Sequence, residues 1–119
     1  MSKSFTIRAI GRVASELTLE QKASTVYVRV PLIGNDYIGR DDEGARTRTT
    51  SVTFTAFGEL AKAIAKNVAK GDQLFIEGHI EEARYEREGK TVYGFNHIVD
   101  EFTFGAPGPL TRERLARNG

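Results

Sequence analysis

The segment that most constrains the fold is Ser51–Ile80, because its hydrophobic period changes twice along its length. Alternating apolar and polar residues predict a strand over residues 51–57, and helical spacing then predicts a helix over residues 59–70. Gly71 is the expected end of that helix, and alternation returns in a strand over residues 73–80. The expected core positions are Val52, Phe54, Ala56, Leu60, Ile64, Val68, Leu74, Ile76 and Ile80. The expected outward positions of the last strand are Phe75, Glu77 and His79.

Shorter alternating segments surround this block. Further strands are expected over residues 4–13, with a bend or bulge at Gly11, over 25–33 and over 92–104. A short strand is expected around residues 17–19. Residues 81–95 are expected to form a hairpin that turns near Glu88-Gly89, and residues 34–50 read as a long loop or a flexible hairpin. These segments predict an all-β fold with one helix, an OB-fold: a five-stranded, partly open Greek-key barrel with the helix between strands 3 and 4.

The chain length fits one domain, since it has 119 residues and 13.2 kDa. We expect a folded domain over residues 1–105. Residues 106–119 are rich in Gly and Pro and then basic, which predicts a flexible basic tail with a short helix near its end.

Composition excludes several kinds of chemistry. The chain has no cysteine, so it offers no disulfide and no thiolate metal site. His79 and His97 are the only histidines, and neither has metal-ligand spacing to other candidate ligands. No nucleophile–base arrangement is recognisable, so the chain is predicted to be neither an enzyme nor a cofactor protein. The net charge of +1 and the pI of about 8.0 say little about partners.

The amino-terminal stretch lacks the apolar core of a signal peptide, and no apolar run approaches the length of a membrane span. We therefore expect a cytoplasmic protein with no membrane partner.

One face of the strand over residues 51–57 is polar until its last residue. Ser51, Thr53, Thr55 and Phe57 share this face, because alternate residues of a strand point the same way. A packed core does not require a row of hydroxyls that ends in an aromatic ring, whereas a surface that holds something flat does. The residues leave a second interpretation open, in which Phe57 is a core residue at the strand–helix corner.

The block FGELAKAIAKNVAKGDQLFIEGHI resembles the bacterial single-stranded DNA-binding protein family, which has the OB-fold. In that family a strand ends in Phe-Gly, a helix begins with Leu-Ala, and Lys-Gly leads into a strand that ends in Glu-Gly. The matching pairs here are Phe57-Gly58, Leu60-Ala61, Lys70-Gly71 and Glu77-Gly78. The charged hairpin YEREGKTVY and the early IGRV are also similar, so the resemblance covers about residues 5–105.

The resemblance implies sequence-independent binding and protection of single-stranded DNA in replication, recombination and repair, with bases stacked on aromatic rings. The matching aromatic positions are Phe57, Tyr85 and Tyr37. Tyr93 shares parity with Tyr85 across the hairpin turn, and a three-residue loop would set the two rings opposite each other. Each ring also has a structural interpretation: Tyr85 and Tyr93 as a pair that only stabilises the hairpin, and Tyr37 as a cover for the barrel mouth.

Polar and basic residues complete the predicted surface. Thr53 and Thr55 would form a polar floor along which the sugar–phosphate backbone of the DNA lies. Outward arginines would bind phosphate, although surface arginines are also common without any ligand. The arginines that we expect to take part are Arg8, Arg12, Arg29, Arg48, Arg84 and Arg87.

Two departures from the family pattern affect partners. Ser51 stands where the family commonly has an aromatic residue, which removes one stacking platform. The chain ends in TRERLARNG, which is basic, where the family usually has an acidic tip that recruits replication and repair proteins. Such recruitment is therefore not expected, and these features are typical of a truncated or a divergent version, such as one from a mobile element. The resemblance also implies a homo-oligomer, a dimer or a tetramer.

Three alternatives remain. An OB-fold assembly or accessory protein with weak nucleic-acid affinity is consistent with Ser51 and the basic end of the chain. An RNA-binding OB module is consistent with stacking aromatics, because stacking does not separate RNA from DNA. A nuclease on the same barrel would need convergent carboxylates or a metal site, and the acids here alternate with basic residues in the loops and the hairpin.

Overall fold

Six strands and two helices form along residues 3–118, the part of the chain that this computed structural model describes. The strands are β1 (Thr6–Val13), β2 (Glu20–Lys22), β3 (Thr25–Asp41), β4 (Gly44–Phe57), β5 (Gln73–Arg87) and β6 (Lys90–Phe104). The helices are α1 (Gly58–Asn67) and α2 (Pro109–Asn118).

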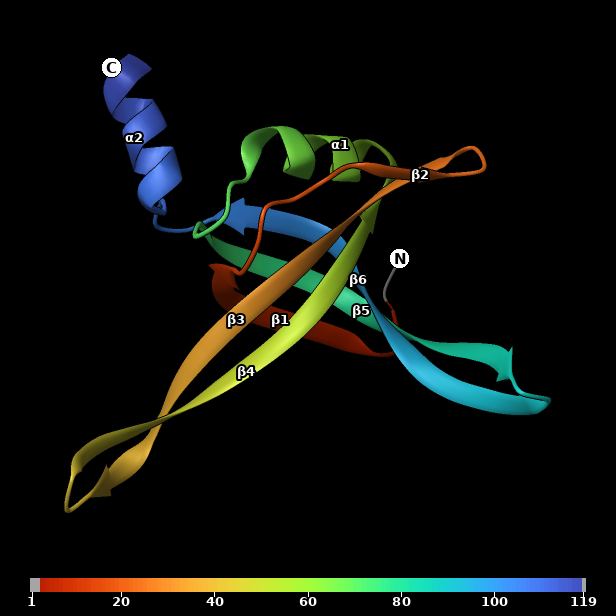
Figure 1. Cartoon of the computed structure of the whole chain (residues 1–119), viewed down its shortest axis with the longest axis horizontal. Coiled ribbons are helices and arrows are strands. Elements are labelled where there is room, and N and C mark those ends of the chain that lie inside the picture. Colours follow the sequence, from red (N-terminus) through yellow and green to blue (C-terminus); the bar gives the residue numbers. More distant parts are fainter. Residues whose placement is uncertain (1–2, 119) are drawn as a thin grey trace.

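The five long strands close into a partly open barrel, shown in Figure 1. β1 pairs with β5 along most of its length and with β3 at its end, so the ring runs β1–β5–β6–β4–β3 and back to β1. The β4–β6 contact is a single parallel pair, Thr55 with Ile98, and this is where the barrel is weakly closed. α1 follows the third long strand and precedes the fourth, which confirms the predicted fold class. The short strand expected at residues 17–19 lies instead at Glu20–Lys22, on the edge of β3.

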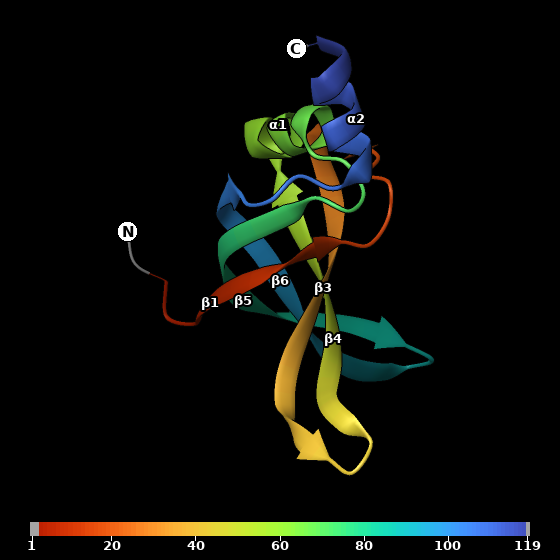
Figure 2. The same ribbon diagram turned by 90° about the vertical axis from the view of Figure 1, so that its left-hand side faces the viewer.

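The core consists of the inward residues of the strands and one face of α1. Phe54, Val30 and Leu74 are almost completely buried, as their alternation predicts. α1 lies across one end of the barrel and buries Ala61 and Ile64 (Figures 1 and 2). Truncating a large core side chain such as Phe54 to alanine is expected to cost about 3–5 kcal/mol.

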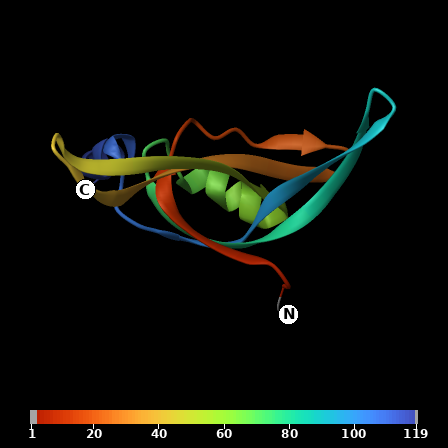
Figure 3. The same ribbon diagram turned by 90° about the horizontal axis from the view of Figure 1, so that it is seen from below.

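Two hairpin arms extend from the barrel and point in different directions (Figure 3). Residues 34–50, predicted as a long loop or a hairpin, form a hairpin: β3 and β4 stay paired out to Asp41 and Gly44. We call this the β3–β4 arm. The β5–β6 arm, residues 81–96, turns at Glu88–Gly89 as predicted. Both turn residues have positive φ, 54° and 77°, which is the geometry of the two-residue turn that matches strand twist.

α1 ends earlier than the sequence predicts. The helix stops at Asn67, and Val68 is already extended, although its buried side chain still packs in the core. The Ala69 N–H donates to the carboxylate of Asp72 at 2.9 Å instead of continuing the helical ladder. Gly71, expected to end the helix, has φ +92° in the turn that follows.

Asp72 also joins the barrel to α2. Its carboxylate accepts hydrogen bonds from the Gly108 N–H at 2.8 Å and from the Thr111 hydroxyl at 2.9 Å. Burial opposes ionisation of Asp72, but the hydrogen bonds from Ala69, Gly108 and Thr111 lower its pKa overall. The division of the chain into a domain and a flexible tail at residue 105 stays a prediction.

Gly11 is required by a close approach between strands rather than by a bulge. The β1–β5 register runs without a shift from Thr6 to Arg12. A Cβ at Gly11 would lie 2.6 Å from the carbonyl oxygen of Ile33, where β1 passes from β5 to β3. The expected bulge is therefore wrong.

Along residues 3–118 there is no helix with the length and apolar character needed to cross a membrane.

Candidate nucleic-acid interface

The outward side of β3 and β4 forms one continuous face, because its residues lie directly across from one another in the antiparallel register. We call it the outer face of β3–β4. Core residues such as Val28 and Phe54 occupy the opposite side. The pairs on the outer face are Tyr27 with Phe57, Arg29 with Thr55, Pro31 with Thr53, Ile33 with Ser51, Asn35 with Thr49, and Tyr37 with Thr47.

At the barrel end of this face lies a groove of about 630 Å³. The groove is lined by residues of β2, β3, β4 and β6, and Ile98 of β6 lies beside Thr55 of β4. We call it the outer groove. Its lining residues are Lys22, Ala23, Thr25, Tyr27, Arg29, Thr55, Phe57, Asn96 and Ile98. None of these residues is acidic, so the charges of the groove are those of Lys22 and Arg29.

Two aromatic rings stand side by side in the outer groove. Phe57 is 46 % exposed, so the interpretation of Phe57 as a core residue is wrong. Gly58 follows with φ +64°, a conformation that suits glycine, and turns the chain directly into α1. The ring centroids of Tyr27 and Phe57 are 6.4 Å apart and the rings are tilted by 44°. The guanidinium of Arg29 lies 5.7 Å from the Tyr27 centroid.

The two tyrosines of the β5–β6 arm lie on opposite faces, contrary to the prediction. The turn has two residues rather than three, so Tyr85 pairs with Val92 and Tyr93 pairs with Arg84. A Cβ at Gly94 would lie 3.9 Å from the Tyr85 ring, which places Tyr85 on the side that continues into Asn96 and the outer groove. Tyr93 lies on the other side, where the Arg84 guanidinium is 5.3 Å from its ring centroid.

Charge also differs between the two faces of this arm. The side of Tyr85 carries Arg87 and Lys90, which pair across the strands, and one acid, Glu81, whose carboxylate contacts His79. The side of Tyr93 carries two glutamates, and Arg84 binds one of them, Glu82, at 3.1 Å. The residues on the Tyr93 side of the arm are Glu82, Arg84, Glu86, Thr91, Tyr93 and Phe95.

The β3–β4 arm extends the outer face. Tyr37 is 64 % exposed and lies across from Thr47, on the same face as Thr53 and Phe57. Arg48 pairs with Asp36 and therefore lies on the other side of the arm. The structure thus brings together Phe57, Thr53, Thr55, Arg29 and, farther out, Tyr37 on one surface, which meets the side of Tyr85 and Arg87 at Asn96.

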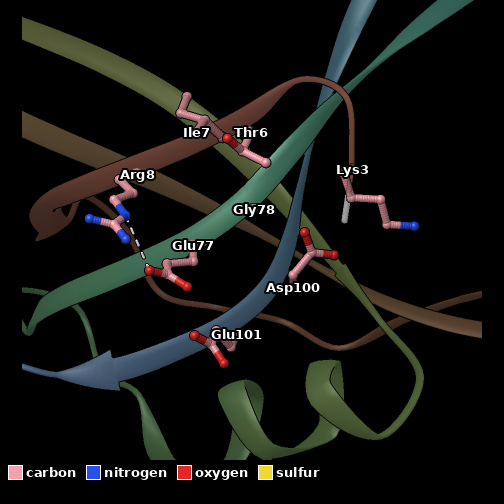
Figure 4. A pocket seen from close by; sticks show the side chains of 8 residues that line it. All are labelled: Lys3, Thr6, Ile7, Arg8, Glu77, Gly78, Asp100 and Glu101. Carbon is pink, nitrogen blue, oxygen red and sulfur yellow. Dashed lines mark ion pairs between the residues drawn. The ribbon is translucent and has the colours of Figure 1, made fainter. Parts of the chain in front are cut away.

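Arg8 and Arg12 lie elsewhere, on the outward side of β1 and β5. Arg8 binds Glu77 at 3.2 Å in a pocket that also contains Asp100 and Glu101 (Figure 4). Arg12 donates to the carbonyl oxygens of Gly71 and Ala106 at 3.0 and 3.3 Å and so ties two loops together. Neither arginine lies at the outer groove.

His79, predicted to face outward into solvent, is buried. The β5–β6 register shifts between Glu77 and Gly78 and leaves Asp100 without a partner across the strands. The Asp100 carboxylate lies 2.9 Å from Nδ1 of His79, and the Glu81 carboxylate lies 2.5 Å from Nε2. The hydrogen bonds to Asp100 and Glu81 raise the pKa of His79. This explains how a polar ring can be covered here without an unpaired atom.

Among residues 3–118 no group of three or more His, Cys, Asp or Glu side chains is arranged to hold a metal ion. The outer groove also contains no acid or histidine that could serve as a general base.

Six residues of the outer groove were not singled out by any motif: Lys22, Ala23, Thr25, Tyr27, Asn96 and Ile98. The alternation of β3 already places Tyr27 outside, next to Arg29. That Tyr27 lies across from Phe57 depends on the β3–β4 register, which one strand alone does not reveal.

The model of the family described as the single-strand binding protein family matches residues 4–105 of the chain. Among solved structures, the wild-type single-stranded DNA binding protein from Thermus aquaticus has a TM-score of 0.72 and 17 % identity, over 85 % of this chain and 50 % of that one. The chain thus spans half the length of the Thermus protein. No curated protein sequence matches the chain.

Two further structures match over nearly their whole length. The small single-stranded DNA-binding protein from Streptomyces coelicolor has a TM-score of 0.66 and 21 % identity, covering 87 % of this chain and 96 % of that one. The Plasmodium falciparum SSB in complex with single-stranded DNA has a TM-score of 0.70 and 16 % identity, covering 88 % and 97 %. At these identities the structures establish the fold, and the family model establishes membership: the chain belongs to the single-strand binding protein family.

Proposed function

We propose that the protein binds single-stranded DNA without regard to sequence and so protects exposed strands. The observation that carries this is the outer groove, where an exposed phenylalanine, a tyrosine and two cationic side chains meet with no acid among the lining residues. The family membership and the likeness to an SSB–DNA complex support the same proposal.

Stacking supplies affinity that tolerates any base. Each base stacked on an aromatic side chain contributes about 1–3 kcal/mol. Phe57 is the first such platform, and Tyr85 and Tyr37 lie on the surfaces that extend from it along the two arms. The arms point apart (Figure 3), so a single strand of DNA would follow one arm, cross the outer groove and continue along the other arm.

Hydroxyls and cations hold the backbone of the strand. Thr53 and Thr55 lie between Phe57 and the β3–β4 arm, and their hydroxyls can donate to phosphate without selecting a base. Arg29 and Lys22 at the groove and Arg87 on the β5–β6 arm supply positive charge. Binding to phosphate releases counterions, so affinity falls as salt rises.

We further propose that the protein is not an enzyme, acts in replication, recombination and repair in the cytoplasm near the nucleoid, and assembles as a dimer or a tetramer. Support for assembly comes from the outward side of β1 and β5, where Ile10 and Phe75 lie across from each other and are 60 % and 41 % exposed. Contiguous exposed apolar patches occur at contact surfaces, and these two side chains would form the centre of such a patch.

The test is a titration of a fluorescently labelled dT oligomer at two salt concentrations, with duplex DNA of the same length and an RNA oligomer as competitors. Wild-type protein should bind the single strand, more weakly at the higher salt, and should bind duplex poorly. Phe57→Ala should weaken binding roughly 5- to 150-fold.

The absence of binding to the dT oligomer at low salt would overturn the proposal. The accessory-protein alternative would then be favoured, and the oligomeric state and protein contacts would be measured next. Preference for RNA over DNA would instead favour an RNA-binding role.

A further inference from the structure

We infer that Tyr27 is a second base platform, so that the outer groove is a site for two consecutive nucleobases, one on Phe57 and one on Tyr27. The inference rests on the proposed function and adds to it a base-binding residue on β3. The ligand is any short single strand of nucleic acid with intact bases.

The position of Tyr27 supports this role. Tyr27 lies directly across from Phe57 in the β3–β4 register, and both side chains line the outer groove. With centroids 6.4 Å apart and a tilt of 44°, the rings touch without stacking on each other. Neither ring therefore uses its partner as a stacking surface, and two bases placed on them would be tilted apart rather than stacked together.

The Tyr27 ring is in contact with a cationic side chain. Arg29 lies two residues along β3, with its guanidinium 5.7 Å from the Tyr27 centroid. Such a contact at an exposed site modestly stabilises this orientation of the ring. Arg29 forms no ion pair with a carboxylate anywhere in residues 3–118, so its guanidinium is available to phosphate.

The side chains that line the groove around Tyr27 and Phe57 also suit a nucleobase. The lining of the groove includes Ile98, which is apolar, Asn96, whose amide can donate to and accept from a base edge, and Lys22 of β2, which is a cation. A groove of about 630 Å³ has room for more than the single base that Phe57 alone would hold. An aromatic pair that served only to join β3 and β4 would need none of these groups.

The structural alternative, a cross-strand pair that only stabilises the sheet, makes a different prediction. In that case, loss of the Tyr27 ring would weaken the binding of any strand through loss of the native fold. A stacking role makes the loss depend on the presence of bases.

The experiment compares a dT oligomer with an abasic phosphodiester strand of the same length. Tyr27→Leu should weaken binding of the dT oligomer roughly 5- to 150-fold, and should leave binding of the abasic strand unchanged. Tyr27→Phe, which keeps the ring, should bind both strands as wild type does. Phe95→Leu is the matched control, since Phe95 is an exposed ring on the other side of the β5–β6 arm.

A second measurement does not require loss of the ring. The protein has four tyrosines and no tryptophan, so a variant with Tyr37, Tyr85 and Tyr93 changed to Phe emits only from Tyr27. The dT oligomer should quench this emission, and the abasic strand should not.

Equal losses of affinity for the two strands, or emission that the dT oligomer leaves unchanged, would overturn the inference and leave the proposed function standing. Wild-type protein that binds no dT oligomer would overturn both. These outcomes are distinguishable because Phe57 and the wild-type protein test the function, whereas only Tyr27 tests the second platform.

Discussion

The barrel has two outward sheet surfaces that contain the same kinds of residue and differ in how their charges are paired. On the outer face of β3–β4, Arg29 lies against Tyr27 beside the exposed Phe57. On the outward side of β1 and β5, Arg8 is bound to Glu77, on the strand that also carries the exposed Phe75. The same two residue types, an arginine and an exposed aromatic ring, are therefore present on both surfaces, with the arginine paired to a carboxylate on only one of them.

The second surface would repel phosphate. Glu77 lies across from Glu101 on β6, and Asp100 lines the same pocket (Figure 4). The hydrogen bond with Glu77 and the charge of Glu77 raise the pKa of Glu101. The outer groove contains no carboxylate among its lining residues. Glu20 lies across from Tyr27 in the β2–β3 register, so the outer face is not free of acids. The two surfaces differ in that Arg8 forms an ion pair with Glu77, whereas Arg29 forms none with any carboxylate of residues 3–118.

The two faces of the β5–β6 arm repeat this contrast and give the prediction with the largest effect. Tyr85→Ala is expected to weaken binding of a dT oligomer roughly 5- to 150-fold, since one stacked base is lost. Tyr93→Ala is expected to leave affinity within about twofold, because Tyr93 lies on the face with Glu82 and Glu86, on the other side of the arm from Asn96 and the outer groove. The measurement is a titration with an oligomer long enough to reach from the groove to the arm. Equal losses in the two variants would show that the arm binds DNA on both faces.

The salt dependence of binding compares the two arginines. Arg29→Ala is expected to reduce the slope of log K against log salt by about 0.7, the value for one phosphate contact with a single strand. Arg8→Ala is expected to leave the slope unchanged, because Arg8 is already paired with Glu77. Titrations at four or more salt concentrations measure both slopes. A change in slope for Arg8→Ala as large as for Arg29→Ala would contradict the comparison.

The fold could be predicted from the sequence because its signals are local. The change of period from strand to helix and back in Ser51–Ile80 marks the helix that covers one end of the barrel. The turn at Glu88–Gly89 marks the tip of the β5–β6 arm. The predictions that were wrong concern features that depend on contacts between residues far apart in the fold or on strand register. α1 ends early because Asp72 binds Ala69, and His79 is buried because the β5–β6 register shifts and leaves Asp100 beside its ring.

The candidate site could be predicted only strand by strand. The shared face of Thr53, Thr55 and Phe57 follows from alternation within β4 alone. Which residues of other strands lie beside them depends on pairing registers, and these cannot be inferred from the pattern of a single strand. A turn of two residues rather than three separates Tyr85 from Tyr93, and the β3–β4 register brings Tyr27 to Phe57.

A smaller difference is expected from the hydroxyls of the two surfaces. Thr53→Val should weaken DNA binding by about 0.5–1.5 kcal/mol if its hydroxyl donates to the strand. Thr103→Val is the matched control, because Thr103 lies across from Phe75 on the outward side of β5 and β6. Calorimetric titration with one oligomer measures both variants. Unchanged affinity for Thr53→Val would mean that the polar row is only a solvated strand face.

The smallest effect is expected in the pH dependence of stability, and it is confined to the surface with paired charges. The pKa of Glu101 is raised by Glu77, so the folded protein holds that proton more tightly than the unfolded chain does. The stabilisation from this proton is fully present below the ordinary pKa of the carboxyl and is lost as the pH rises through the raised value. Because Glu101 is exposed, the effect is screened and small.

Glu101→Gln should remove this contribution. The difference in free energy of unfolding between Glu101→Gln and wild type, followed by urea denaturation, should favour the variant increasingly as the pH rises from about 4 toward neutrality. Over the same pH range Glu101→Gln should bind DNA as wild type does. Glu101 does not line the outer groove but lies beside Arg8 and Glu77 on another surface. A variant whose DNA affinity rises together with its stability would mean that the acidic surface also faces the bound strand.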